Sequence, residues 1–294
     1  MSAGWTTYTP ADIPRLAELT PPARFAVFGD PVAHSRSPQM HNAALQELGL
    51  GAQYVRIHVR PEEFADAVRA CQQKGFLGIN CTIPHKHAAL AIADEADPLA
   101  RRLGVANTLA FRGGKIHAWN TDGVGLTRAL SEEFELDPQS QRVLILGAGG
   151  GAGRAAAIYF ALAGCPHLAL ANRTREKIER LAEELAALMP AERISLQTEP
   201  CLEDVDLVIN ATSVGMKPDD PPLIPPTLFQ PRHVVFDMIY SPPETRLLRD
   251  AQAAGARIAN GLSMLLHQGA ASLEHWLERP APVDAMRRGL MESF

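Results

Sequence analysis

The stretch RVLILGAGGGAGRAAAIYFALAG, residues 142–164, decides the fold. It opens with a mostly apolar segment typical of a buried strand, and its alanine-rich second half is typical of a helix. Between them, Gly147-x-Gly149-x-x-Ala152 matches the turn at which a dinucleotide's pyrophosphate meets the free N–H groups of a helix N-terminus. We therefore predict a dinucleotide-binding unit. The alternative is a glycine-rich turn that serves only packing.

The end of the next strand, HLALANRT (167–174), indicates which dinucleotide is bound. NAD-binding proteins usually carry an acid there that accepts a hydrogen bond from the ribose 2′-OH. This chain has Asn172-Arg173-Thr174 instead. An arginine and a hydroxyl suit a 2′-phosphate, so NADP is the predicted cofactor. A solvated loop arginine is the alternative explanation of Arg173.

Strand-like and helix-like segments alternate along the rest of the chain, which predicts an α/β fold of two domains with mostly parallel sheets. The segment NTLAFRGGKIHAWNTD predicts a hairpin around Gly113-Gly114. Residues 1–23 are rich in Thr and Pro and show weak periodicity, so we expect a loosely attached N-terminal extension.

Composition excludes several classes of function. The chain has 294 residues and a formal net charge of -5, so the basic surplus of nucleic-acid-binding proteins is missing. No apolar stretch is long enough to span a bilayer, and the N-terminus does not resemble a signal peptide. Four widely spaced cysteines form no CxxC pair, which disfavours a zinc ribbon or a redox dithiol. We expect a soluble, cytoplasmic protein with reduced thiols and neither nucleic acid nor membrane as partner.

Two segments of the first half carry candidate chemistry. Ser35 and Ser37 precede a predicted helix, where a serine usually caps the helix but two serines can also hold a carboxylate. Lys86 lies in the first turn of a helix expected to begin at Pro84, where the helix dipole disfavours a cation, so a role in proton transfer is possible. A solvated surface lysine is the alternative. His85 and His87 have no acid or cysteine pair nearby, so no metal site is expected.

These motifs together resemble the shikimate dehydrogenase family, NADP-dependent enzymes that reduce 3-dehydroshikimate to shikimate on the way to chorismate and the aromatic amino acids. The resemblance covers about residues 25–277 in the family's order. It is carried by GDPVAHSRSPQMHN, GINCTIPHK, GVANT, NTDGVG, GAGGGAGRA, ANRT, INATSVGM, DMIYSPPETRLL and GLSMLLHQG.

The resemblance implies a substrate domain over residues 24–124, completed by C-terminal helices over 263–294, and a Rossmann-type NADP domain over 125–262. It makes Lys86 and Asp122 the catalytic pair and Ser35 and Ser37 the holders of the substrate carboxylate. The other implied substrate contacts are Asn80, Thr82, Asn107, Tyr240 and Gln268. The implied cofactor contacts are Gly147, Ala148, Gly149, Gly150 and Gly151 for the pyrophosphate, Asn172, Arg173 and Thr174 for the 2′-phosphate, and Thr212, Met238 and Gly261 near the nicotinamide.

The glycine run differs from the family's usual pattern by one additional residue, which leaves the phosphate contacts open. Two alternatives to shikimate dehydrogenase stand. A quinate/shikimate dehydrogenase is disfavoured by Ser37 and Arg173, because quinate-preferring relatives often carry Thr and an acid at these places. A non-catalytic ligand-binding relative is disfavoured because Lys86 and Asp122 are both present. We expect a monomer or a homodimer.

Overall fold

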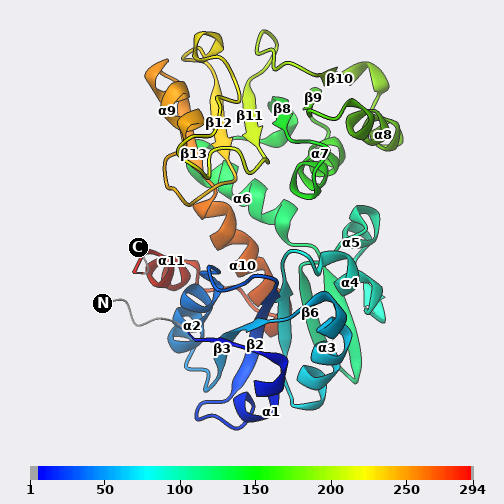
Figure 1. Ribbon diagram of the computed structural model, residues 1–294, viewed down its shortest axis with the longest axis vertical. Helices are drawn as coiled ribbons and strands as arrows, with labels where there is room; N and C mark the ends of the chain where they lie inside the picture. The colour runs from blue at the N-terminus through cyan, green and yellow to red at the C-terminus, as the bar shows by residue number, and fades with distance from the viewer. Residues whose placement is uncertain (1–5, 293–294) are drawn as a thin grey trace. The chain divides into compact units, whose positions relative to one another are not determined.

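The computed structural model describes residues 6–292 and divides the chain into two compact units (Figure 1). The first unit contains the residues up to Asp122 together with those from Leu266 onward, and the second contains Gly123–Leu265. The boundaries implied by the family resemblance, 124/125 and 262/263, lie close to these positions. Both units have the predicted α/β architecture with mostly parallel sheets, and this prediction is confirmed.

The first unit is built on a seven-stranded sheet with the order β1-β3-β2-β4-β6-β7-β5. Only the β4–β6 and β6–β7 pairs are antiparallel. The predicted hairpin joins β6 to β7, and Gly113 and Gly114 adopt the positive φ angles of 57° and 80° that its two-residue turn requires. The strands are β1 (Thr7–Tyr8), β2 (Ala23–Gly29), β3 (Gln53–His58), β4 (Gly78–Cys81), β5 (Glu95–Ala96), β6 (Thr108–Arg112) and β7 (Lys115–Trp119).

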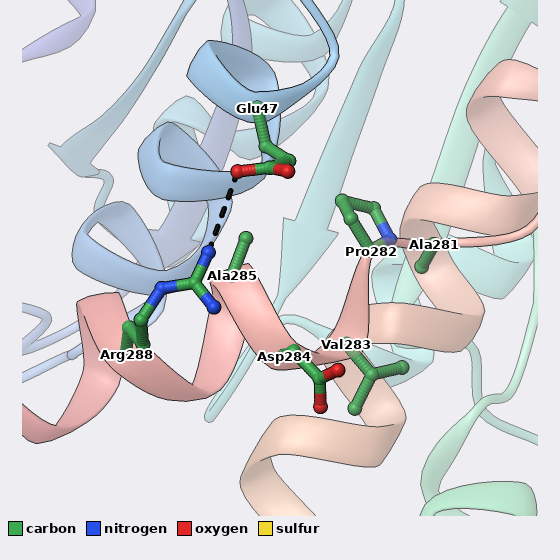
Figure 2. Close-up of a pocket in the computed structure, with 7 residues that line it drawn as sticks. All are labelled: Glu47, Ala281, Pro282, Val283, Asp284, Ala285 and Arg288. Atoms are coloured by element: carbon green, nitrogen blue, oxygen red, sulfur yellow. Dashed lines mark hydrogen bonds and ion pairs between the residues drawn. The ribbon is translucent and has the colours of Figure 1, made fainter.

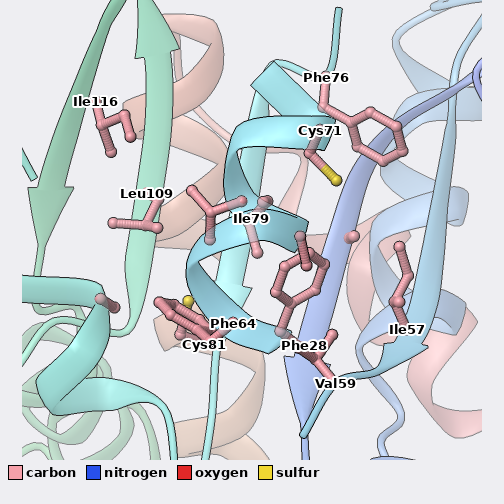
Figure 3. Packing of buried hydrophobic residues seen from close by; sticks show 14 of the residues in the cluster. Phe28, Ile57, Val59, Phe64, Cys71, Phe76, Ile79, Cys81, Leu109 and Ile116 are labelled. Carbon is pink, nitrogen blue, oxygen red and sulfur yellow. The ribbon is translucent and has the colours of Figure 1, made fainter. Parts of the chain in front are cut away.

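Helices cover both faces of this sheet. They are α1 (Ile13–Leu16), α2 (Ser37–Glu47), α3 (Phe64–Gln73), α4 (Lys86–Ala91), α5 (Pro98–Leu103), the later part of α10 (Leu262–Leu277), and α11 (Val283–Met291). Figure 3 shows α3 placing Phe64 and Cys71 against Phe28 and Ile79 of the sheet. From α10, Trp276 packs against Phe25, with the ring centroids 5.0 Å apart and the rings tilted by 31°, and it donates a hydrogen bond to the Leu109 carbonyl at 2.8 Å.

The predicted loose attachment of the N-terminal segment is wrong for residues 6–23. β1 pairs in parallel with β3, and Ile13 and Leu16 are completely buried in the core of the first unit. A two-residue strand and a four-residue helix are too short to show periodicity, although they bury enough apolar surface to attach the segment. Residues 1–5 of the predicted extension lie outside the described residues.

The second unit is a parallel sheet of six strands with the order β10-β9-β8-β11-β12-β13. The order reverses between β8 and β11, and in such sheets a ligand binds beyond the carboxyl ends of the strands at that position. Its strands are β8 (Arg142–Leu146), β9 (His167–Ala171), β10 (Ile194–Gln197), β11 (Leu207–Asn210), β12 (Val234–Asp237) and β13 (Arg257–Asn260). Its helices are α6 (Asp122–Phe134) apart from its first residue, α7 (Gly151–Ala163), α8 (Arg175–Leu185), α9 (Arg246–Ala253) and the start of α10.

Candidate active site

Lys86 and Asp122 form an ion pair in the first unit, with 2.7 Å between Nζ and Oδ2. Lys86 is the first residue of α4, two residues later than the predicted helix start, and Asp122 is the first residue of α6. Their side chains are 30% and 19% exposed, so a ligand can reach both groups. A cation and a carboxylate in contact, partly shielded from water, can transfer a proton and orient the group that transfers it.

Asn107 holds the other carboxylate oxygen. Its Nδ2 donates to Asp122 Oδ1 at 2.9 Å, and its Oδ1 accepts from the backbone N–H of Thr121 at 2.9 Å. A backbone N–H can only donate, so this contact fixes the orientation of the Asn107 amide. The predicted substrate residue Asn107 therefore also holds the predicted catalytic Asp122.

Asn80 is 6% exposed, and most of its hydrogen-bonding capacity is used inside the protein. Its Oδ1 accepts from the Tyr54 hydroxyl at 2.8 Å, and its Nδ2 donates to Ser272 Oγ at 2.9 Å and to the Asn107 carbonyl at 3.2 Å. One acceptor position on Oδ1 is left for a ligand. The sequence prediction missed Tyr54 and Ser272, which belong to no local motif.

Ser35 and Ser37 lie together, with 3.2 Å between their Oγ atoms. The N-cap position of α2 is Arg36, which makes no side-chain cap, and Ser35 Oγ accepts from the backbone N–H of Ser37, the first residue of the helix, at 3.3 Å. Behind them, the buried Arg56 donates to the carbonyls of Ala33 and Ser35. This brings a positive charge to the loop that carries both hydroxyls, an arrangement suited to a carboxylate.

The remaining predicted substrate residues are distributed over both units. Thr82 follows β4, and its backbone N–H donates to the Phe28 carbonyl at 2.9 Å. Gln268 lies on α10 in the first unit, where its carbonyl accepts from Ser272 Oγ at 3.0 Å. Tyr240 belongs to the second unit, in the segment that follows β12.

The glycine turn after β8 has the expected form. Gly147 has a φ of 77°, its carbonyl accepts from Gly150 N at 2.9 Å, and α7 begins at the next residue. A Cβ on Gly153 would lie 2.3 Å from the Gly147 carbonyl oxygen, whereas Ala152 is exposed. Gly153 therefore allows the helix to pack closely on the turn. The assignment of Ala152 to the third motif position is wrong, because the additional residue shifts this position by one.

The predicted 2′-phosphate segment lies beside this turn. A Cβ on Gly149 would lie 3.1 Å from Asn172 Cγ and 2.7 Å from Lys177 Cβ. Asn172 Nδ2 donates to the Thr174 carbonyl at 3.0 Å and closes the loop before α8. Arg173 is exposed and, within the described part of the chain, forms no ion pair, so its guanidinium is available to an anion. The other residues of the glycine turn that are predicted to contact the pyrophosphate are Ala148, Gly150 and Gly151.

Thr212, Met238 and Gly261 lie in the segments that follow β11, β12 and β13, at the carboxyl edge of the parallel sheet. A Cβ on Gly147 would lie 2.6 Å from Thr212 Cγ2, so Thr212 packs on the glycine turn. A Cβ on Gly261 would lie 2.1 Å from the Met238 carbonyl oxygen, so any larger residue is excluded there. The predicted cofactor residues of the second unit thus occupy one edge of its sheet.

Other features of the described residues point to no additional chemistry. Among residues 6–292, no cluster of three His, Cys, Asp or Glu side chains is arranged to hold a metal ion. No helix in the same range is long and apolar enough to cross a membrane. An open pocket beside α11 contains none of the predicted site residues, and its Glu47 and Arg288 pair with each other at 3.3 Å. Figure 2 shows this pocket with its lining residues Glu47, Ala281, Pro282, Val283, Asp284, Ala285 and Arg288.

Comparison with known proteins agrees with this geometry. The family model of the shikimate dehydrogenase substrate binding domain matches residues 27–109, that of shikimate / quinate 5-dehydrogenase matches 129–217, and that of the shikimate 5'-dehydrogenase C-terminal domain matches 261–291. Shikimate dehydrogenase (NADP(+)) of Methanopyrus kandleri is 45% identical over 273 residues, which cover 90% of this chain and 94% of the relative.

Solved structures are similar over almost the whole chain. A shikimate dehydrogenase in complex with NADP+ has a TM-score of 0.85 at 34% identity and covers 99% of both chains. The Thermus thermophilus shikimate 5-dehydrogenase in complex with NADP(H) and shikimate has a TM-score of 0.83 at 35% identity, covering 92% of this chain and 100% of the other. The resemblance stated from the sequence is confirmed, and the chain belongs to the shikimate dehydrogenase family.

Proposed function

We propose that this protein catalyses the reversible, NADP-dependent reduction of 3-dehydroshikimate to shikimate, a step in the formation of chorismate and the aromatic amino acids. The observation that carries the proposal is the Lys86–Asp122 pair, 2.7 Å apart and held by Asn107, in the unit that the substrate-binding family model covers. The solved relatives with NADP or with shikimate bound support the same assignment.

The residues of the second unit fit NADP. The turn at Gly147–Gly151 and the N-terminus of α7 offer backbone N–H groups to the pyrophosphate, and Asn172, Arg173 and Thr174 provide a cation and polar groups for the 2′-phosphate. The cofactor supplies the hydride when it is bound. Lys86 donates a proton to the oxygen of the reduced ketone, and in the oxidation direction it accepts that proton. Asp122 orients the ammonium group.

The first unit fits a polyol that carries a carboxylate. Ser35 and Ser37, with Arg56 behind their loop, provide hydroxyls and positive charge for the carboxylate. Asn80, Thr82 and Gln268 provide uncharged donors and acceptors for ring hydroxyls, while Asn107, whose amide is hydrogen-bonded within the protein, holds Asp122 for the same substrate. A site built from such groups discriminates strongly, because a missing hydroxyl leaves a buried polar group unpaired.

The test is a steady-state assay of the purified protein with shikimate or quinate and with NADP or NAD, followed through formation of the reduced cofactor. We expect turnover of shikimate with NADP and much weaker turnover in the other three combinations. A preference for quinate or for NAD would replace the proposal with a quinate/shikimate dehydrogenase. Binding of shikimate without turnover would identify a non-catalytic relative, which the intact Lys86–Asp122 pair disfavours.

The proposal also includes the cellular location and the oligomeric state. We place the enzyme in the cytoplasm, in keeping with four cysteines that are all free thiols, three of them buried. We expect it to act as a monomer or a homodimer, which sedimentation of the purified protein distinguishes.

A further inference from the structure

Asp237 is a buried carboxylate for which the mechanism above has no use. It is the last residue of β12, and its exposed fraction is 0%. Oδ1 accepts hydrogen bonds from Asn210 Nδ2 at 2.9 Å and from the Ile239 backbone N–H at 3.0 Å, and Oδ2 accepts from Thr245 Oγ1 at 2.6 Å. Within residues 6–292 no cation pairs with it. Burial raises the pKa of Asp237, and the hydrogen bond from Thr245 acts in the opposite direction. Burying a carboxylate without a cationic partner costs free energy of folding, so we expect Asp237 to have a specific role.

The hydrogen bonds around Asp237 have a fixed direction. The backbone N–H of Thr212 can only donate, and it donates to Asn210 Oδ1 at 2.9 Å. The amide of Asn210 must therefore turn its Nδ2 toward Asp237, where it needs an acceptor. The backbone N–H of Ile239 also donates to Asp237 Oδ1 and needs an acceptor there. A carboxylate, which only accepts, satisfies both donors.

The chain of contacts ends at a residue predicted to face the cofactor. Thr212 Oγ1 donates to Asn210 Oδ1 at 2.7 Å and accepts from the Val214 N–H at 3.1 Å. The hydroxyl proton is therefore committed, and toward a ligand Thr212 can offer only an acceptor. Thr212 also packs on Gly147 of the glycine turn, which places that acceptor beside the dinucleotide motif.

We propose that Asp237 is a positioning residue of the cofactor site, which acts through Asn210 to hold Thr212 as a hydrogen-bond acceptor beside the glycine turn. The inference rests on the proposed function, because it takes NADP as the ligand of this site.

The test compares Asp237→Ala with the control Thr245→Val. The control removes the donor to Oδ2 and the cap of α9 but leaves Asn210 and Thr212 in place. We measure the dissociation constant of NADPH by fluorescence titration, the KM for shikimate, and Tm. Asp237→Ala should weaken NADPH binding about tenfold, the equivalent of one hydrogen bond of roughly 1.4 kcal/mol, and change the KM for shikimate less than about twofold. Thr245→Val should lower Tm and leave NADPH binding within about twofold.

Two further variants separate positioning from general destabilisation. Asp237→Asn keeps an acceptor for Asn210 and can turn its amide N–H toward the Thr245 hydroxyl, so it should restore most of the affinity lost in Asp237→Ala. Adding Thr212→Val to Asp237→Ala should cause little extra loss, because both changes remove the same contact. If Asp237→Ala does not fold, Asn210→Ser interrupts the same chain of contacts and should give the same tenfold loss and the same non-additivity.

Each outcome decides the inference. If Asp237→Ala (or Asn210→Ser) and Thr245→Val lose NADPH affinity to the same extent for a given loss of Tm, Asp237 has only a structural role. Additive losses with Thr212→Val would break the link to that residue. In both cases wild-type enzyme still binds NADPH and turns over shikimate, so only this inference fails. A wild-type protein that does not bind NADPH overturns the proposed function and the inference with it.

Discussion

Replacing Asp122 with Asn tests the proposed catalytic pair. The carboxylate accepts from Lys86 Nζ through Oδ2 at 2.7 Å and from Asn107 Nδ2 through Oδ1 at 2.9 Å. An asparagine has a single side-chain oxygen, so in either orientation its NH2 group faces one of these two donors. The substitution therefore removes one charge-assisted hydrogen bond, worth about 1.5–3 kcal/mol, which corresponds to roughly 10- to 150-fold. We expect kcat/KM to fall by about 10²-fold, with both kcat and KM affected.

The assay is steady-state kinetics in both directions, with Glu95→Gln as the matched control. Glu95 also pairs with a lysine in the first unit, Lys115 at 2.6 Å, but that pair is half exposed and should contribute little. In a cycle with Lys86→Ala, the double variant should be little worse than the worse single variant, because the pair acts as a unit. A folded Asp122→Asn enzyme that keeps kcat/KM within about threefold of wild type, or fully additive losses, would refute the reasoning.

Three other changes test separate parts of the molecule. Lys86→Ala should lower kcat by about 10²–10⁴-fold while shikimate binding, measured calorimetrically, changes far less; near-normal kcat at neutral pH would contradict the proton-transfer role. Arg173→Ala should raise the KM for NADP by roughly 10- to 100-fold and leave that for NAD nearly unchanged, because one charged contact to the 2′-phosphate is lost; an unaltered NADP-to-NAD ratio would mean that Arg173 does not select the cofactor. Complete burial lowers the pKa of His41 from 6.5 to about 3, so between these two values the unfolded chain binds a proton that the folded chain does not. The free energy of unfolding should therefore decrease as pH falls through this window, with up to about 1.4 kcal/mol per pH unit from this residue. Urea titrations at several pH values should show a weaker pH dependence of the unfolding free energy for His41→Phe than for wild type. The same pH dependence in both proteins would show that His41 contributes nothing.

The sequence was most informative where short segments carry their own geometry. A strand, a glycine turn and a helix are contiguous in residues 142–164, and the hairpin at Gly113-Gly114 depends on two adjacent residues. Lys86 was a candidate from its place in the first turn of a predicted helix, and the family resemblance made it a catalytic pair with Asp122. The structure brings the two together although 36 positions separate them. No local pattern links Asn80 to Ser272, which lie 192 positions apart in the chain and are joined only by the folded first unit.

The misjudged elements have related causes. The additional residue in the glycine run is visible in the sequence, but which residue takes the third motif position depends on how closely α7 packs on the turn at Gly153. The N-terminal segment is anchored by Ile13 and Leu16. How much these two apolar side chains stabilise the fold depends on the core against which they pack. Local propensity and spacing do not report such long-range packing.

The division of the first unit into two stretches of chain has a consequence for protein synthesis. The second unit is contiguous, whereas the first needs Trp276 to fill the space that Gly78 leaves open, and α11 to pack on α2. A ribosome therefore releases every residue of the second unit before it releases those that complete the first. Although nascent domains usually fold from the N-terminus onward, here the later-encoded unit can mature first. Stalled nascent chains in which the start of α10 has already left the ribosomal tunnel should capture NADP, while shikimate capture must await the final segment.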